Sequence, residues 1–350
     1  MAYTTIDDPS VYFQTALYTG NESGQSITND GNSDLQPDLV WIKNRGDAHG
    51  HQWQDSTRGV GKALESNNTD AEATGTVPDN FTAFGSDGFT LGAGHQKYND
   101  QDDTYVAWQW KANGGTTTTN DASATGVGDI DSVYQANTTA GFSIVTYTHT
   151  GNDDRVAHGL GATPKVVIIK ERGGAGSWYY VTTQVDGSLE YLLLEAQNAI
   201  ASLGYSVHTS TTFPSLQFDN TDTAVAYCFT EIQGYSKFGS YTGNGNADGP
   251  FIYTGFKPAW FLVKSTNQSN QQWYVFDNKR DTINPVTRQL QPNLNDAENN
   301  VTNSPLDFLS NGIKIRNTSG HDNTNNGGYI YMAFAEHPFV SSEGVPVTAR

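Results

Sequence analysis

The sequence offers few groups of residues whose types and spacing could hold a metal ion. Its histidines fit neither the HExxH pattern nor the spacing of a zinc finger, and His49 and His51 form the only close pair. Residues two positions apart on a strand point to the same face and could share a metal ion, but no third ligand is evident. We therefore predict ordinary surface histidines and no metal site. The eight histidines are His49, His51, His95, His149, His158, His208, His321 and His337.

Nucleophilic and acid–base chemistry find equally little support. The chain contains no GxSxG, Walker A or dinucleotide-binding motif. Ser86 precedes Asp87-Gly88, and Ser310 precedes Asn311-Gly312 in the same way, which indicates turn chemistry rather than a nucleophile. Two carboxylates could cleave a glycan if they lay about 5 to 10 Å apart, so a depolymerase stays an alternative. We predict no enzyme, no catalytic residues and no cofactor.

Two acidic loops, residues 99–103 and 151–154, carry the oxygen ligands that calcium prefers. Neither loop fits the EF-hand spacing, so solvated loops are the simpler interpretation. Cys228 is the single cysteine, which rules out a disulfide within the chain and a thiolate metal cluster.

Tryptophans recur on strand-like runs, at Trp53, Trp178 and Trp273, and could stack on sugar rings. Their recurrence favours a buried core role, because tryptophan supplies a large apolar area. Trp41 and Trp260 lie inside buried-looking runs and are interpreted in the same way.

Asp55 precedes Arg58, and Asp277 precedes Arg280, by three residues each. These pairs are predicted to form a repeated ion pair or turn lock rather than an active site.

The strands that would position these residues occur as three blocks with one order of landmarks. Each block has a strand ending in Gly-Asn, a proline followed by a hydrophobic run closed by lysine, a tryptophan strand and a final aromatic strand. The proline-to-lysine runs read as strands buried on both faces. They are residues 37–43, 164–170 and 258–264.

These landmarks predict an all-β chain of three tandem antiparallel β-sandwich units, of jelly-roll or concanavalin-like type. The units are expected at residues 1–112, 139–233 and 234–350, with a Gly/Thr-rich linker at residues 113–138. The second unit lacks the Asp and Arg after its tryptophan and the Asp/Asn-Gly hairpin. Helix is expected to be minor, and its best window is Leu192 to Leu203.

Charge restricts the partners. The chain carries 37 acidic and 19 basic side chains, a net charge of −18, which repels phosphate backbones and anionic lipids. We expect no nucleic-acid partner and no membrane insertion, since no stretch of 18 apolar residues occurs. The start MAYTTIDDPS lacks the basic and apolar regions of a secretion signal.

Several runs resemble an uncharacterised repeat family that is common in virion proteins of marine bacteriophages. The resembling runs are residues 139–148, 158–165, 234–245, 329–336 and 338–350. The resemblance implies lectin-like sandwich units on a phage particle, as a tail fibre, tail spike, head fibre or decoration protein, and it implies no catalytic residues.

From this resemblance we expect a virion protein that contributes to recognition of a host-surface glycan, assembled in the host cytoplasm. Its expected partners are other virion proteins of the capsid or tail, and its expected assembly is a homo-oligomer such as a homotrimer. A capsid decoration or tail adaptor protein without a ligand is the first alternative, and a host-polysaccharide depolymerase is the second.

Overall fold

The computed structural model describes residues 3–75, 77, 80–151, 153–216 and 221–346. Within this part of the chain the fold is almost entirely antiparallel β structure, which confirms the predicted fold class. The helical elements there are η1 (Pro9–Val11) and α1 (Ala122–Thr125), and neither is long or apolar enough to cross a bilayer. We call residues 1–112 the first block, 139–233 the second block and 234–350 the third block.

The first block forms a main sheet and a small sheet. The main sheet has the order β1 (Phe13–Thr19), β9 (Thr104–Trp110), β3 (Leu39–Asn44), β4 (Gln52–Asp55), β5 (Lys62–Glu65) and β6 (Ala73–Thr74). The small sheet has the order β2 (Gln25–Ile27), β8 (Gly88–Leu91) and β7 (Phe81–Gly85). Gly88 opens β8 with φ of 104°, so the predicted Asp-Gly hairpin is confirmed.

The second main sheet includes residues that were predicted to be a linker. Its order is β10 (Thr118–Asn120), β11 (Ser132–Asn137), β12 (Phe142–Thr148), β19 (Thr223–Phe229), β14 (Val166–Glu171), β15 (Trp178–Thr182), β16 (Glu190–Leu193) and β17 (Ala201–Ser202). Because β11 pairs along its whole length with β12 and also pairs with β10, residues 118–120 and 132–137 belong to the sheet, and the linker prediction was wrong for them. The small sheet is β13 (Arg155–Ala157) with β18 (Thr212–Pro214).

The third main sheet has the order β20 (Ser236–Thr242), β28 (Gly328–Pro338), β22 (Phe256–Ser265) and β23 (Trp273–Asp277). Its small sheet is β21 (Phe251–Tyr253), β27 (Gly312–Ile315) and β26 (Leu306–Leu309), so the Asn-Gly hairpin is also confirmed. A further pair joins β24 (Arg288–Gln289) to β25 (Asn299–Asn300).

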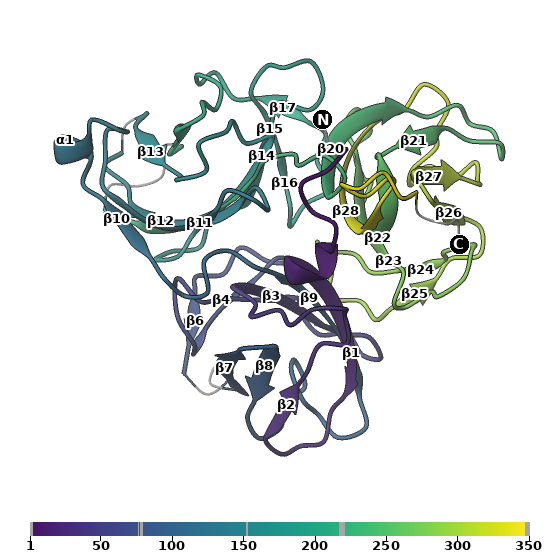
Figure 1. The fold of residues 1–350 in the computed structure, drawn as a ribbon, viewed down its shortest axis with the longest axis horizontal. Helices are drawn as coiled ribbons and strands as arrows, with labels where there is room; N and C mark the ends of the chain where they lie inside the picture. Colours follow the sequence, from purple (N-terminus) through teal and green to yellow (C-terminus); the bar gives the residue numbers. More distant parts are fainter. Residues whose placement is uncertain (1–2, 76, 78–79, 152, 217–220, 347–350) are drawn as a thin grey trace.

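One strand order recurs in all three main sheets: the opening strand, the closing aromatic strand, the lysine-terminated strand and the tryptophan strand. The series are β1-β9-β3-β4, β12-β19-β14-β15 and β20-β28-β22-β23. Figure 1 shows the three blocks as lobes around a common centre, the first at the bottom, the second at the upper left and the third at the upper right.

Each lysine-terminated strand is buried on both faces, as predicted, because its alternate side chains serve two different cores. Leu39 and Trp41 point into a central core shared by all three main sheets, whereas Val40 and Ile42 point into a core between the main and small sheets of the first block. The second and third blocks have corresponding outer cores. Sharing the central core binds the three main sheets into one body.

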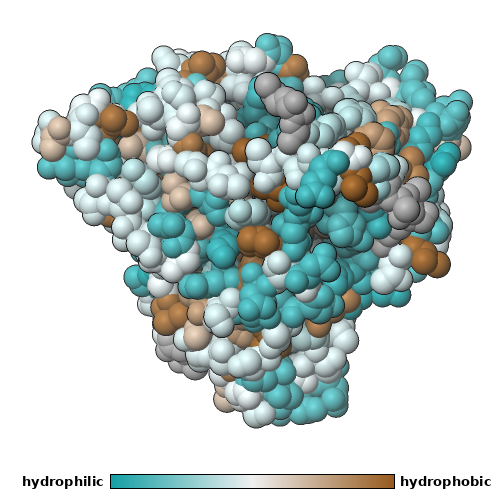
Figure 2. Space-filling model, in the orientation of Figure 1, coloured by the Kyte–Doolittle hydropathy of each residue, from teal (hydrophilic) through white to brown (hydrophobic). Residues whose placement is uncertain are grey.

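One detail departs from the sequence analysis. The window Leu192 to Leu203, the best candidate for a helix, is not helical: its first two residues belong to β16 and pair with β15, and Ala201 and Ser202 form β17, which pairs with β16. The face of the molecule in Figure 2 carries mostly hydrophilic and intermediate residues with scattered hydrophobic ones.

Candidate functional site

The repeated tryptophans are buried, which confirms their predicted core role. Trp53, Trp178 and Trp273 are at most 1% exposed. However, the prediction that Trp53 occupies the same strand position as Trp178 and Trp273 was wrong. Lys170 pairs with Trp178 and Lys264 with Trp273, whereas Trp41, two residues before Lys43, pairs with Trp53.

The matching position in the first block therefore belongs to His51, not to Trp53. His51 is fully buried and accepts a hydrogen bond at Nδ1 from Trp41 Nε1 at 2.9 Å. Burial lowers its pKa well below the ordinary value. His51 is thus a core residue, and its neighbour His49 is only partly buried.

Other histidines also contradict the prediction of surface positions. His149, His158 and His208 are buried in the second block. Among the described residues, no group of three or more His, Cys, Asp or Glu side chains could hold a metal ion.

Where the first block meets the second, buried charges form a junction cluster. Arg58 Nε contacts Asp55 Oδ2 at 2.5 Å, and Arg58 Nη1 contacts Glu72 Oε2 at 2.9 Å. The second block supplies Arg172, whose Nε lies 2.8 Å from Glu72 Oε2, and Tyr227, whose hydroxyl donates to Asp55 Oδ2 at 2.8 Å. The predicted Asp55–Arg58 pair is confirmed, and its partners link two blocks.

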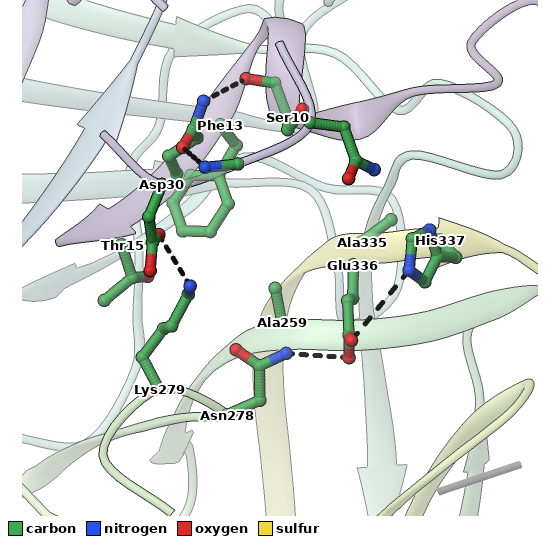
Figure 3. A pocket seen from close by; sticks show the side chains of 13 residues that line it. Ser10, Phe13, Thr15, Asp30, Ala259, Asn278, Lys279, Ala335, Glu336 and His337 are labelled. Atoms are coloured by element: carbon green, nitrogen blue, oxygen red, sulfur yellow. Dashed lines mark hydrogen bonds and ion pairs between the residues drawn. The ribbon is translucent and has the colours of Figure 1, made fainter. Parts of the chain in front are cut away.

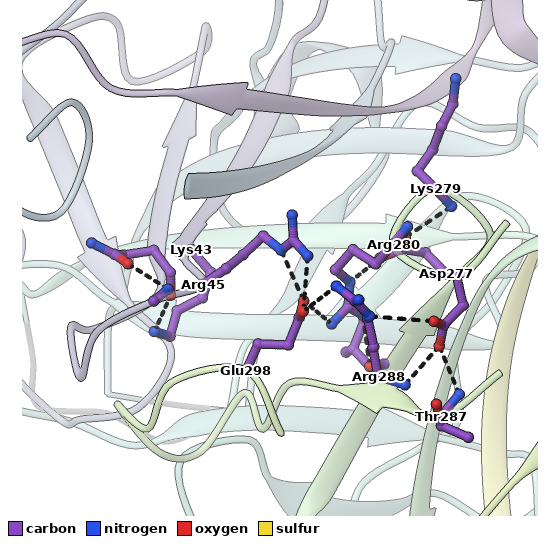
Figure 4. Close-up of polar contacts among 12 residues, drawn as sticks. Lys43, Arg45, Asp277, Lys279, Arg280, Thr287, Arg288 and Glu298 are labelled. Carbon is purple, nitrogen blue, oxygen red and sulfur yellow. Dashed lines mark hydrogen bonds and ion pairs between the residues drawn. The ribbon is translucent and has the colours of Figure 1, made fainter. Parts of the chain in front are cut away.

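Where the third block meets the first, the same arrangement recurs (Figure 4). Arg280 Nε contacts Asp277 Oδ2 at 2.6 Å, and its Nη1 contacts Glu298 Oε2 at 3.2 Å. Arg45 Nη2 of the first block lies 2.8 Å from Glu298 Oε1, and Trp108 Nε1 donates to Asp277 at 3.0 Å. The predicted Asp277–Arg280 pair is likewise confirmed.

The electrostatics of Glu72 and Glu298 follow from these contacts. Burial raises the pKa of each carboxyl group, but the hydrogen bonds and charges of the surrounding arginines outweigh burial and hold both pKa values below the ordinary one. Both glutamates are therefore ionised at neutral pH, and their charges are balanced by arginines from two blocks.

The buried side-chain contacts at the junction of the second block with the third are neutral, and the ion pair there, Lys237 with Glu231 at 3.1 Å, is partly exposed. Thr182 takes the place of Asp55 and Asp277 in the strand register. Gln184 Nε2 donates to the carbonyl oxygens of Tyr331 at 2.7 Å and Gly239 at 3.1 Å.

One backbone hydrogen bond is common to all three junctions. Glu72 N donates to Arg172 O at 2.9 Å, Glu298 N to Arg45 O at 2.8 Å, and Ile200 N to Thr266 O at 2.8 Å. These bonds join each block to the next around the ring.

The cross-junction partners were missed by the sequence analysis, although a signal was available. Glu72 and Glu298 each end an Asp-Ala-Glu triplet, at residues 70–72 and 296–298, and residues 198–200 read Asn-Ala-Ile. Arg45 and Arg172 each lie two residues after the strand-closing lysine, where the third block has Thr266.

Those three lysines are also buried. Lys43 donates to Asp47 O at 3.0 Å, Lys170 to Glu171 O at 2.8 Å and Lys264 to Gln271 O at 2.8 Å. Burial lowers the pKa of each to about 8. Carboxylates oppose this shift at Lys43 and Lys170, whereas burial alone acts on Lys264.

The remaining candidates are Ser86 and the acidic loops 99–103 and 151–154. Ser86 is exposed in its turn. In the loop 99–103, Asn99 is buried and donates to the carbonyl oxygens of Ser23 at 2.6 Å and Gly92 at 2.9 Å, which is a loop-fixing role. In the loop 151–154, residue 152 lies outside the described residues.

Several surface hollows lie on the described part of the molecule. A hollow of about 190 Å³ lies between the first and third blocks (Figure 3), where Lys279 reaches Asp30 at 2.7 Å and Asn278 donates to Glu336 at 2.7 Å. A wider hollow of about 410 Å³ lies on the second block and is lined by Tyr179, Tyr191 and Tyr205 with residues 202–204 and 216.

Residues 8–338 match the model of a family described as a domain of unknown function, DUF7483. No curated protein matches the sequence.

Proposed function

The chain belongs to the DUF7483 family, and from its own architecture we propose that it is a structural protein of a bacteriophage virion that contributes to recognition of host-surface glycans. In this proposal residues 1–112, 139–233 and 234–350 act as three sandwich-like units of one appendage. The runs that resemble marine phage virion proteins support the assignment to a particle.

The observation that carries the proposal is that buried charged side chains join neighbouring blocks. Asp55, Arg58, Asp277 and Arg280 are fully buried and hold neighbouring blocks together. These aspartates and arginines, residue types that could also serve in catalysis, instead join the sheets of neighbouring blocks. Burial of paired charges fixes a specific arrangement, since any misalignment leaves a charge unpaired in the interior.

A ring of this kind suits a particle appendage. The three main sheets share one core, so the loops at the outer rim keep fixed positions relative to one another. Weak binding by such loops gains avidity when several copies of the protein act together. We propose a homo-oligomer, with a homotrimer as the first expectation, attached to other capsid or tail proteins.

The test combines localisation and binding. Gold-labelled antibodies against the purified chain should decorate phage particles in electron micrographs, and the purified chain should be retained on host cells and on host polysaccharide. Retention with no change in polysaccharide length supports recognition. Decoration of particles without retention would instead support a capsid decoration or adaptor protein.

Shortened polysaccharide would support a depolymerase and would overturn the non-enzymatic part of the proposal. Absence of the chain from particles would overturn the virion assignment.

A further inference from the structure

The three opening strands, β1, β12 and β20, differ in what covers their outer edge. Each pairs on its inner edge with the closing aromatic strand of its block. In an antiparallel pair, successive residues direct their N–H and C=O groups to opposite sides. Gly20 N donates to Asp103 O and continues the ladder between β1 and β9, so the even-numbered residues of β1 bond to β9. Thr15 and Leu17 therefore direct their backbone groups outward.

In the second block this outer edge is covered by the chain itself. β11 lies antiparallel along β12, and Gln135 of β11 pairs with Ile144. Ile144 is the counterpart of Thr15, because each lies two residues after the phenylalanine that opens its strand. The Gln135 side chain is fully buried and reaches the first block, where its Nε2 donates to Ser56 Oγ at 2.9 Å and to Thr57 Oγ1 at 2.8 Å. A strand at this edge thus places an amide in the junction between two blocks.

In the third block a side chain caps the same edge. Phe238 is the counterpart of Thr15, because it lies two residues after the start of β20. Its N–H donates to Glu231 Oε1 at 2.9 Å, and Glu231 also pairs with Lys237 of β20 at 3.1 Å. Charged side chains at an edge strand hinder its pairing with another chain. The edge of β20 is therefore protected.

The first block leaves the outer edge of β1 open. Among the described residues, no group bonds to the outward N–H of Thr15 or of Leu17. β1 contains no charged residue and no proline, its register with β9 has no bulge, and Leu17 is 41% exposed. Charges, prolines and bulges are the usual means by which natural edge strands avoid pairing. An edge that lacks all three is suited to accept a partner strand.

The hollow between the first and third blocks lies at the place that Gln135 fills beside the second block (Figure 3). It is lined by Thr15 of β1 and by Lys279 of the third block. Lys279 is the counterpart of Thr57, because each lies two residues after the aspartate that ends the tryptophan strand of its block. The volume of about 190 Å³ is below the roughly 300–1,000 Å³ of small-molecule sites, and it suits a single side chain.

The charges and hydrogen bonds around the hollow favour an uncharged polar side chain. Lys279 lies 2.7 Å from Asp30, and Glu336 lies 3.1 Å from Lys257, so each charge already has an opposite partner. Thr15 is only 4% exposed, and its hydroxyl group has no hydrogen-bond partner within the described part of the chain. Buried hydroxyl groups are normally hydrogen-bonded. An amide that entered the hollow would give this hydroxyl a partner.

We propose that the outer edge of β1 binds an extended segment of another protein as an added antiparallel strand, with one uncharged amide side chain of that segment in the hollow. Main-chain hydrogen bonds supply the affinity in this mode of recognition, and the hollow for a side chain supplies the specificity. The inference goes beyond the proposed function, because it requires neither a virion nor a glycan.

The test measures binding of an acetylated and amidated peptide to the full chain by isothermal titration calorimetry. The peptide has the uncharged sequence of residues 132–138, Ser-Val-Tyr-Gln-Ala-Asn-Thr, which covers β11. We expect saturable binding with a Kd on the order of 100 μM, since a short segment loses conformational freedom on binding. Leu17→Pro removes an outward N–H without removing a bond between β1 and β9, so it should weaken binding about tenfold or more.

Ser240→Pro is the matched control variant. Ser240 is exposed and holds the place of Leu17 in β20, four residues after the start of the strand. Because the edge of β20 is capped, this substitution should leave binding unchanged. Near-ultraviolet circular dichroism of both variants checks that the fold is intact.

Two modified peptides test the strand pairing without changing the protein. In the pairing of β11 with β12, the N–H of Gln135 points toward β12 and that of Ala136 points away from it. Methylation of the backbone nitrogen at the Gln135 position should therefore weaken binding about tenfold, whereas methylation at the Ala136 position should keep it within about threefold. Replacing the glutamine of the peptide by alanine should also weaken binding, because the hollow then stays empty.

The outcomes decide between this edge and other sites. If the peptide binds folded Leu17→Pro as tightly as the wild type, the edge of β1 is not the site. Equal effects of the two methylations would contradict strand pairing, and absence of binding to the wild type at about 1 mM peptide would overturn the inference altogether. Sedimentation velocity tests the occupant: self-association that Leu17→Pro abolishes and Ser240→Pro keeps would show that the edge pairs with a second copy of this chain instead.

Discussion

The first and second blocks meet through buried charges, whereas the buried side chains between the second and third blocks are neutral and the ion pair there, Lys237 with Glu231, is partly exposed. Both junctions keep the same backbone hydrogen bond, from Glu72 N to Arg172 O in one and from Ile200 N to Thr266 O in the other. What the ring requires is this backbone contact and the apolar core behind it. The side chains around the contact have diverged, from Asp–Arg–Glu–Arg clusters to the amide of Gln184.

The difference between charged and neutral junctions determines how much stability is lost when one side chain is removed. A buried ion pair adds little net stability, because the cost of taking both charges out of water offsets their Coulomb attraction. Removing one partner is strongly destabilising, since the other charge is then left buried without compensation. A neutral hydrogen bond contributes about 1 kcal/mol and costs about 1–3 kcal/mol when one buried partner is lost. The charged junctions should therefore be the sensitive ones.

The largest expected effect comes from breaking a charged junction. Arg280→Ala leaves Asp277 buried without its arginine, so we expect the free energy of unfolding to fall by about 3–5 kcal/mol. Gln184→Ala at the neutral junction should cost about 1–3 kcal/mol. Urea unfolding followed by tryptophan fluorescence measures both. Arg316→Ala is the control, because Arg316 forms an exposed pair with Asp307, and equal losses for Arg280→Ala and Gln184→Ala would contradict the comparison.

Acid should weaken the second block in particular, because it buries His149, His158 and His208. Burial lowers the pKa of His208 to about 3, helped by the charge of Arg155, and those of the other two to about 4. The unfolded histidine has a pKa near 6.5, so between pH 6.5 and the folded value the unfolded chain binds more protons. Stability is therefore complete above about pH 6.5 and declines as the pH falls.

For one histidine this loss is about 2 kcal/mol at pH 5. We expect His208→Leu to reduce the difference in unfolding free energy between pH 7 and pH 5 by about this amount. Urea unfolding at the two pH values measures it. His49→Leu is the control on the partly exposed histidine of the first block, and an unchanged pH difference in His208→Leu would argue against a buried neutral imidazole.

The buried Lys264 of the third block should make the free energy of unfolding depend on pH in the mildly alkaline range. Burial lowers the pKa of Lys264 to about 8, and an unfolded lysine titrates near 10.4. From pH 8 upward the unfolded chain binds the extra proton, so stability rises with pH, by about 1.5 kcal/mol between pH 8 and pH 9.5. Lys43 and Lys170 have the same lowered pKa and contribute their own rise, so Lys264→Met should reduce the total rise by about 1.5 kcal/mol, because methionine fills the space without a charge.

The measurement is urea unfolding of the wild type and of Lys264→Met at pH 8 and pH 9.5. Unfolded tyrosines, with a pKa near 10, begin to ionise in this range, and the comparison with the wild type cancels their contribution. Lys237→Met, at a 40% exposed lysine, is the control and should leave the rise unchanged. A rise in Lys264→Met equal to that of the wild type would assign the whole rise to other groups.

The sequence alone predicted the strand set because its signals are local. Asp-Gly and Asn-Gly turns, the proline-to-lysine runs and the aromatic closing strands each act within a few residues. The Asp55–Arg58 pair was also within reach, since its members are three residues apart. Its partners Glu72 and Arg172 could be noticed only as recurring residues; their contact could not be predicted, because 100 residues separate them and only the ring brings them together.

The strand position of Trp53 was predicted wrongly for the same reason, because it depends on contacts between residues far apart in the sequence. Trp53 resembles Trp178 in type, yet the register with the lysine-terminated strand puts His51 in that place. Cross-strand register depends on pairing over long range, and a shift of two residues keeps every side chain on its face, so the hydrophobic pattern is unchanged. The pairing of residues 118–120 and 132–137 in a sheet was hidden by their polar composition, since β10 lies at the edge and many side chains of β10 and β11 are exposed or partly exposed.

The smallest expected effect concerns a charged contact between the third and first blocks that is exposed rather than buried. Lys279 lies 2.7 Å from Asp30, and their side chains are 38% and 71% exposed. Water screens such a pair, so Lys279→Ala should change the unfolding free energy by less than about 0.5 kcal/mol, and high salt should remove even that. Arg280 joins the same two blocks only one residue away, so comparing Lys279→Ala with Arg280→Ala isolates burial as the variable. A loss above about 1 kcal/mol for Lys279→Ala would mean that charge across this junction matters whether or not it is buried.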